Sequence, residues 1–153
     1  MFQLPFPVRD ANVSGGAGEF GELPEWDLSD LYTAEDAPEL IRDLAWLEEE
    51  CANFARDYEG KLAELDAAGF LACVLRNEKI NGIAGRIMSY AGLRYYQLTI
   101  DAGRAKFLSD MQEKITNFTT PLVFFTLELN RLDDGVLDEL FAESAELARY
   151  KPV

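Results

Sequence analysis

Apolar residues recur at steps of three and four positions along most of this chain, and that spacing predicts helices. The longest series consists of Leu108, Met111, Ile115, Phe118, Leu122, Phe125, Leu129 and Leu132. These residues form a heptad-like seam on one face of a helix. No segment alternates apolar and polar residues as strands do. The sequence therefore predicts an all-α antiparallel bundle of about four to six helices, the longest at residues 102–132 with a kink near Pro121.

Start and stop signals mark the first helix clearly. Asp36 and Glu39 match a capping box, in which the first side chain caps the helix and the second reaches back to its start. An apolar stripe follows over residues 40–58, and Gly60 predicts a bend after it. We therefore expect a helix that begins near Asp36 and ends before Gly60.

The later helices are predicted from similar signals. A short helix is expected at residues 66–75, and a longer one with Asn77 as its cap. Glycines within the longer helix would allow a neighbouring helix to approach closely; they are Gly82, Gly85 and Gly92. Asp101 is expected to cap the longest helix, and Asp133 begins a turn into a last amphipathic helix.

Two regions are predicted from the distribution of breakers and apolar residues. Prolines and glycines predict a flexible arm at residues 1–22, and the helical domain is expected at residues 23–153. At its front edge, apolar side chains are expected to pack on the helices; they are Trp26, Leu28, Leu31 and Tyr32. No apolar run has the length of a signal peptide or a membrane span, which favours a soluble, cytoplasmic protein with no membrane partner.

Charge and histidine content exclude several classes of function. The net charge of −14 argues against a nucleic-acid partner, because phosphate binding needs clustered basic residues. The chain has no histidine, which excludes HExxH zinc sites and Ser-His-Asp or Cys-His catalytic pairs within it. Cys51 and Cys73 are expected to be buried free thiols rather than a disulfide or metal site. The residues thus predict no catalytic group, no metal ligand set and no cofactor in this chain.

The charges are also unevenly distributed along the chain. Residues 22–66 hold 15 acidic and 3 basic residues, whereas residues 76–114 hold 7 basic and 4 acidic residues. One interpretation is solvated helix faces with some pairing between helices. The other is that the basic segment faces a cavity and holds a negatively charged group.

Two further sets of polar residues have both a structural and a functional interpretation. Carboxylate pairs at i,i+4 include Glu39 with Asp43 and Asp134 with Asp138, and such pairs are usually solvated unless one member is buried. Tyr90, Tyr95 and Tyr96 with Arg94 would line a peptide groove, or pack in the core or an interface. No substrate-binding residue is assigned from these patterns.

Five segments carry a resemblance to a known family. They read Leu-Pro-Glu-Trp-Asp-Leu-Ser-Asp-Leu-Tyr at 23–32, Phe-Ala-Arg-Asp-Tyr-Glu-Gly-Lys at 54–61, Tyr-Ala-Gly-Leu at 90–93, Phe-Phe-Thr-Leu-Glu-Leu at 124–129 and Arg-Tyr-Lys-Pro at 149–152. Asp101 follows the third segment at a familiar distance. In this order the segments resemble the N-terminal region of oligoendopeptidase F and its relatives, zinc metallopeptidases of the thimet-oligopeptidase type. The resemblance spans residues 23–152.

The resemblance implies a helical N-terminal domain that covers a deep channel and restricts entry to short, unstructured peptides. Its partner would be a C-terminal catalytic domain with the HExxH helix, a glutamate zinc ligand, and a tyrosine and a histidine for the transition state. No position of these 153 residues matches them, so zinc is implied only for a full-length enzyme. The resemblance also predicts an uncovered apolar face that includes Phe124 and some of Tyr90, Tyr95 and Tyr96.

A second hypothesis belongs to another class of protein. The long seam at residues 108–132 also fits a free-standing acidic helical interaction module that dimerises through that seam. A stable, specific dimer would favour this module, whereas a monomer with an exposed apolar surface, or loose self-association through exposed apolar helix faces, would favour the domain.

Overall fold

The computed structural model describes residues 26–151, and within that range the chain forms helices and no strand. The α-helices are α1 (Pro38–Tyr58), α2 (Ala67–Gln97), α3 (Ala102–Thr119), α4 (Val123–Leu129) and α5 (Asp134–Glu143). Short 3-10 turns are η1 (Leu62–Glu64), η2 (Thr120–Leu122) and η3 (Leu147–Tyr150). The predicted all-α fold is therefore confirmed. The arm predicted at residues 1–22 lies outside the described residues.

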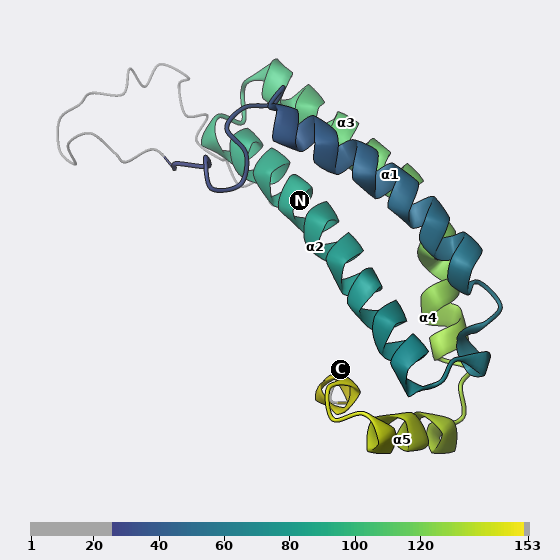
Figure 1. The fold of residues 1–153 in the computed structure, drawn as a ribbon. Helices are drawn as coiled ribbons and strands as arrows, with labels where there is room; N and C mark the ends of the chain where they lie inside the picture. The colour runs from purple at the N-terminus through teal and green to yellow at the C-terminus, as the bar shows by residue number, and fades with distance from the viewer. Residues whose placement is uncertain (1–25, 152–153) are drawn as a thin grey trace, which may run out of the picture.

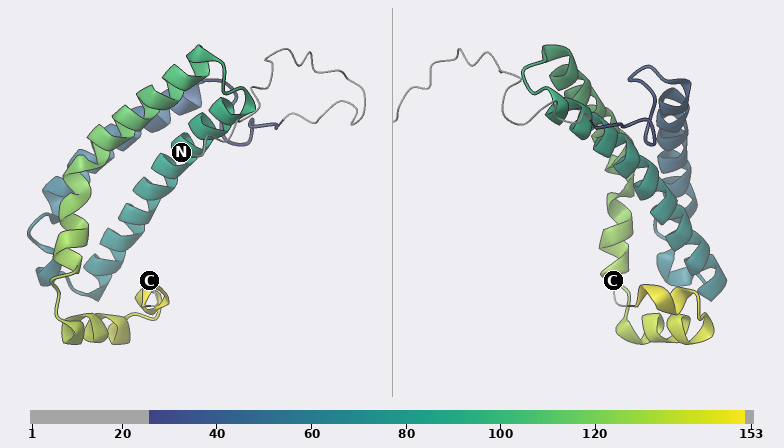
Figure 2. Two further views of the ribbon diagram at one scale, coloured as in Figure 1. Left: turned by 180° about the vertical axis from the view of Figure 1, so that it is seen from behind. Right: turned by 90° about the vertical axis from the view of Figure 1, so that its left-hand side faces the viewer.

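Helices α1, α2 and α3 pack against one another, and each helix runs antiparallel to the one before it (Figure 1). After η2, α4 extends the path of α3 toward the end of α1. Helix α5 and η3 cross the start of α2 at that end of the molecule (Figure 2). The result is a three-helix bundle with a small crosswise layer at one end.

The longest helix is not where the sequence predicts it. Helix α2 has 31 residues and is continuous, so the predicted division into a helix at 66–75 and another capped by Asn77 is wrong. Asp66 caps the whole helix by accepting a hydrogen bond from the Gly69 N–H, and no glycine or proline interrupts residues 70–81. Residues 102–132 contain two α-helices, because Pro121 sits in the 3-10 turn η2 that separates them.

Helix α1 begins one residue later than the capping box predicts. The cap is Ala37, which makes no side-chain cap hydrogen bond, so the prediction for Asp36 is wrong. Pro38 explains the difference, because a proline pushes the residue before it into an extended conformation. The Glu39 carboxylate instead accepts hydrogen bonds from the backbone N–H and the hydroxyl of Thr33, at 3.3 and 2.7 Å. Asp101 caps α3 as predicted.

The glycines that the sequence singles out lie in two different settings, a bend after α1 and the interior of α2. Gly60 has φ of +77°, a left-handed conformation that other residues rarely adopt, and it makes the predicted bend after α1. Gly82 and Gly85 lie on an open face of α2, where an added Cβ would meet nothing within 4 Å. The predicted close approach of a helix at these glycines is therefore wrong within the described residues.

Most of the seam is used inside the chain. Met111 is buried in the main core, and Leu108, Ile115, Phe118, Leu122, Phe125 and Leu129 pack against that core. A smaller cluster joins the start of α2 to α5 and η3 through Ala67, Phe70, Leu140 and Leu147. The seam therefore faces α1 and α2 and offers no continuous face to a second chain.

Candidate functional site

The tyrosines and the arginine that the sequence suggests as a groove are only partly brought together. Tyr90 and Arg94 line a hollow of about 390 Å³ between α2 and residues 26–35. Tyr90 is 2% exposed, and its ring meets that of Tyr32 edge to face at 5.4 Å. Burial raises the pKa of the Tyr90 phenol. Tyr95 and Tyr96 do not line the hollow, so the interpretation as a groove is not supported, whereas the interpretation as core packing holds for Tyr90.

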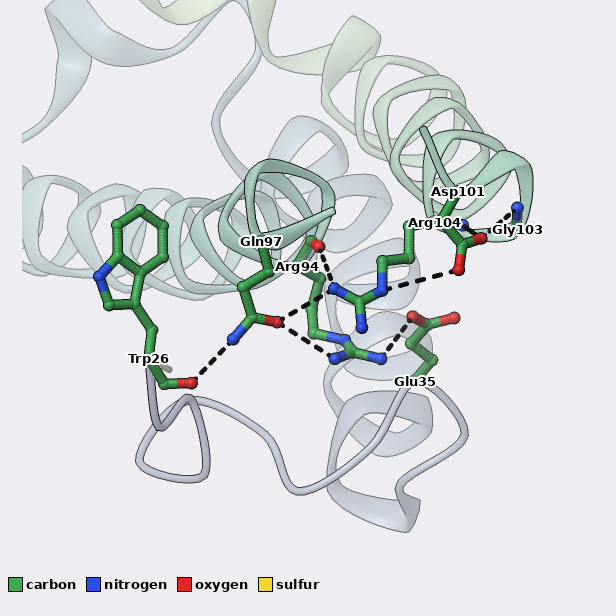
Figure 3. A network of polar contacts seen from close by, with 7 residues as sticks. All are labelled: Trp26, Glu35, Arg94, Gln97, Asp101, Gly103 and Arg104. Carbon is green, nitrogen blue, oxygen red and sulfur yellow. Dashed lines mark hydrogen bonds and ion pairs between the residues drawn. The ribbon is translucent and has the colours of Figure 1, made fainter. Parts of the chain in front are cut away.

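A network of polar contacts forms one side of this hollow (Figure 3). Arg94 lies 3.3 Å from the Glu35 carboxylate and donates to the Gln97 side-chain oxygen at 3.2 Å. The Gln97 amide donates to the Trp26 carbonyl at 2.8 Å. Arg104, from α3, donates to the Arg94 carbonyl at 3.2 Å. The network therefore ties the segment before α1, the end of α2 and the start of α3 together.

This hollow is a structural joint rather than an anion site. The guanidinium of Arg94 faces Glu35, and that of Arg104 lies 4.0 Å from the Asp101 carboxylate. One polar atom, Arg94 Nε, is buried without a hydrogen-bond partner among the described residues. The remaining Arg94 nitrogens are paired, so no full positive charge is left to hold an anionic ligand.

Among the other basic side chains of residues 76–114, Arg76 and Arg86 pair with acids on α1, while Lys106 pairs with Asp110 on its own helix. Arg76 contacts Glu50 and Asp57, and Arg86 contacts Asp43. The Arg76 guanidinium holds the pKa of the Asp57 carboxyl below its usual range. Pairing between helices, the first interpretation of the charge distribution, thus accounts for Arg76 and Arg86.

The front-edge segment is fixed to the bundle through Tyr32. Its side chain is buried, its hydroxyl donates to Asp43 at 2.8 Å, and the Arg86 guanidinium lies 4.3 Å above its ring. Burial raises the Tyr32 pKa, and the Asp43 carboxylate adds to the shift. Trp26 is 56% exposed among the described residues, so its predicted packing on the helices is not observed. Leu28 and Leu31 are half-buried against the core.

A second joint lies at the far end of α1. The Glu128 carboxylate accepts hydrogen bonds from the backbone N–H groups of Gly60 and Leu62, at 2.7 and 3.5 Å. The Phe54 ring lies 6.0 Å from Phe124 and 5.7 Å from Phe125. Phe124 is 8% exposed. The prediction that Phe124 is uncovered is wrong, because α4 turns this ring toward α1.

The remaining candidate residues have structural surroundings. Cys51 and Cys73 are free and buried, as predicted, and burial raises their thiol pKa values to about 11 and about 12. Asp138 pairs with Lys151 at 2.7 Å, while Glu39 and Asp43 are engaged as described above. In residues 26–151 no three side chains of the His, Cys, Asp or Glu type are grouped to hold a metal ion.

A second concave surface is an apolar groove that the sequence patterns do not reveal. It has a volume of about 660 Å³ and lies between α2, α4, α5 and η3. Its apolar walls include Phe70, Val74, Phe125, Leu129, Leu137 and Phe141. In the sequence, Leu137 and Phe141 form an ordinary amphipathic stripe. The side chains that they face in the structure depend on the angle at which α5 crosses α2. Apolar spacing alone carries no information on that angle.

Comparisons with known proteins return no match: no family model, no curated protein and no solved structure corresponds to this chain. Within residues 26–151 no helix is both long and apolar enough to cross a membrane. Function must therefore be argued from the residues and their contacts.

Proposed function

We propose that residues 23–152 are the N-terminal helical domain of an oligoendopeptidase F-type zinc metallopeptidase. In the full-length enzyme the domain would form one wall of the channel and admit only short, unstructured peptides. The observation that carries the proposal is that four of the five segments resembling the family meet in two pairs in three dimensions. Contacts of this kind are expected when the segments together specify one domain.

The first pair joins residues 54–61 with residues 124–129. The two segments are far apart in sequence, yet Glu128 of one binds the Gly60 N–H of the other at 2.7 Å. Lys61 completes the joint, because its ammonium donates to the carbonyls of Arg56 and Asp57 at the end of α1, at 3.1 and 2.9 Å. Gly60, Lys61 and Glu128 thus each make a specific contact in this joint.

The second pair joins residues 23–32 with residues 90–93. Tyr32 and Tyr90 are both buried, and their rings meet edge to face. The last segment, residues 149–152, is tied back to α2, since the Tyr150 hydroxyl donates to Glu78 at 2.7 Å. Each resembling segment is therefore placed by a contact with a distant part of the bundle.

This chain's own residues do not fit a zinc site. The sequence has no histidine, and no suitable group of ligands exists in residues 26–151. The zinc ligands and the water-activating glutamate would belong to the catalytic part of the full-length enzyme. The role proposed for the present residues is shaping the channel and excluding large substrates.

The test begins with the coding sequence downstream of Val153. We expect an open reading frame that reaches an HExxH motif. The protein encoded by the whole frame should cleave a quenched fluorescent octapeptide and lose that activity with a zinc chelator. The 153-residue chain alone, as the matched control, should do neither. A stop codon directly after Val153, or one tightly bound zinc per purified chain, would contradict the proposal.

The alternative, a free-standing acidic module that dimerises through the seam, finds less support. The seam residues pack against α1 and α2 within one chain. Sedimentation of the purified chain separates the two functions, because a stable dimer at micromolar concentration favours the alternative.

A further inference from the structure

The groove between α2, α4, α5 and η3 has the features of a peptide-binding site. Its volume of about 660 Å³ lies within the range of about 300–1,000 Å³ that is usual for ligand sites. Phe70 is buried in its floor, while Val74, Leu137 and Phe141 are half-buried along its walls. These half-buried walls leave apolar surface in contact with water, and an apolar ligand would remove it.

The rim of the groove holds amide groups that suit a peptide backbone. Asn77, on α2, and Asn130, at the end of α4, both line it. Neither side chain makes a hydrogen bond to the rest of residues 26–151. Each asparagine amide offers both a donor and an acceptor, which matches the C=O and N–H of one peptide unit.

The charge around the groove is negative. Glu78 and Asp134 line it, and Asp138 stands next to Lys151. Among residues 26–151, Lys151 is the only base that lines the groove, and its ammonium is already paired with Asp138 at 2.7 Å. Asp134 is exposed in the first turn of α5 and forms no ion pair with the rest of the described chain. An occupant with a positive charge therefore gains a free carboxylate partner.

We propose that this groove binds an extended, apolar peptide segment that carries one basic side chain and is supplied by a separate polypeptide. Apolar side chains of the segment pack between Val74 and Phe141, Asn77 and Asn130 hold its backbone, and Asp134 receives the basic group. The proposal does not depend on the metallopeptidase assignment, because it uses only residues and contacts of this chain.

The test uses the ¹⁵N-labelled 153-residue chain and a capped peptide, acetyl-Gly-Phe-Leu-Lys-Phe-Gly-amide. Titration is followed by amide chemical shifts, which report both the affinity and the location of binding. We expect saturable shifts in the first turns of α2, in α4 and in α5, with little change near Arg94. A matched peptide with glutamate in place of lysine should bind about two- to fivefold more weakly, the range expected for the loss of one exposed ion pair.

Variants with matched controls assign the effect to the groove. Asp134→Asn should weaken binding of the lysine peptide about two- to fivefold, whereas Glu139→Gln, on the same helix but outside the groove, should not. Leu137→Asn should weaken it about tenfold or more, and its control is Val136→Asn. Circular dichroism checks that α5 still forms, and the Asp134→Asn arm remains decisive if Leu137→Asn does not fold.

Three results would overturn the proposal. The first is the absence of saturable shifts up to about 1 mM peptide, a concentration that corresponds to about −4 kcal/mol of binding. The second is equal affinity for the lysine and glutamate peptides. The third is a dimer in sedimentation whose formation shifts the groove resonances without peptide, since the occupant would then be a second copy of the chain.

Discussion

Phe54 provides the sharpest test of how α1 is joined to α4. Its side chain is fully buried, and its ring meets that of Phe125 edge to face, with centroids 5.7 Å apart. Phe54→Leu removes this ring contact and leaves a small cavity, so we expect the free energy of unfolding to fall by about 1–3 kcal/mol. Phe125 is half-buried, and Phe125→Leu should cost about 1 kcal/mol. Urea unfolding followed by far-ultraviolet circular dichroism measures both values.

A double-mutant cycle separates the ring pair from simple burial. Aromatic pairs contribute about 0.5–1.5 kcal/mol beyond the area they bury. The double variant should therefore be less destabilised than the sum of the single variants by that amount. The control is Phe107→Leu, whose ring packs on Tyr90 at 6.1 Å. Phe107 precedes Phe124, which packs on Phe54, by 17 residues along α3, η2 and α4, and Phe107→Leu should be additive with Phe54→Leu within about 0.5 kcal/mol.

The outcome that refutes the reasoning is a coupling energy for Phe54 and Phe125 no larger than that of the distant control pair. The two rings would then contribute only through the surface they bury. The joint between α1 and α4 would have to depend on Glu128 and the backbone groups of Gly60 and Leu62 instead.

Two further predictions concern glycines and thiols. Gly82→Ala, on an open helix face, should raise the free energy of unfolding by about 1 kcal/mol. Gly60→Ala should lower it by about 1–2 kcal/mol, because Gly60 has a positive φ. Urea unfolding measures both, and a change of the same sign in the two variants would contradict the prediction. Cys51 and Cys73 have thiol pKa values of about 11 and about 12, above the value of about 8.5 expected in the unfolded chain. The native state therefore holds these protons more tightly, and the free energy of unfolding should fall as pH rises above about 8.5. The variant with both cysteines replaced by alanine should lose less stability over that range.

The predictable part of the fold is the part that local spacing determines. The apolar stripe of α1, the cap at Asp101 and the bend at Gly60 depend on neighbours in sequence, and all three are found. Helix α2 continues through Asn77, because a polar residue that can cap a helix also fits a helix interior when no glycine or proline accompanies it. Asp36 does not cap α1, because Pro38 holds Ala37 in an extended conformation and the helix begins after it.

The candidate site depends on contacts that spacing cannot supply. Tyr90, Tyr95 and Tyr96 are close in sequence, but a helix turns successive residues by about 100°, so they point to different surroundings. Tyr96 is 65% exposed while Tyr90 is buried against Tyr32. The groove was missed for a related reason, since its walls come from α2, α4 and α5 and are assembled only when these helices cross.

Phe125, which lies in the resembling segment 124–129, belongs to both the joint between α1 and α4 and the apolar groove. Its ring contacts Phe54 on one side and lines the groove on the other. A residue type required at this position for packing would therefore also preserve the groove, whether or not the groove binds anything. The two functions can be separated, because Phe125→Leu should lower both the stability and the affinity for the lysine peptide. Asp134→Asn should lower the affinity while changing the free energy of unfolding by less than about 1 kcal/mol. If both variants change stability alone, the groove is a consequence of packing and not a binding site.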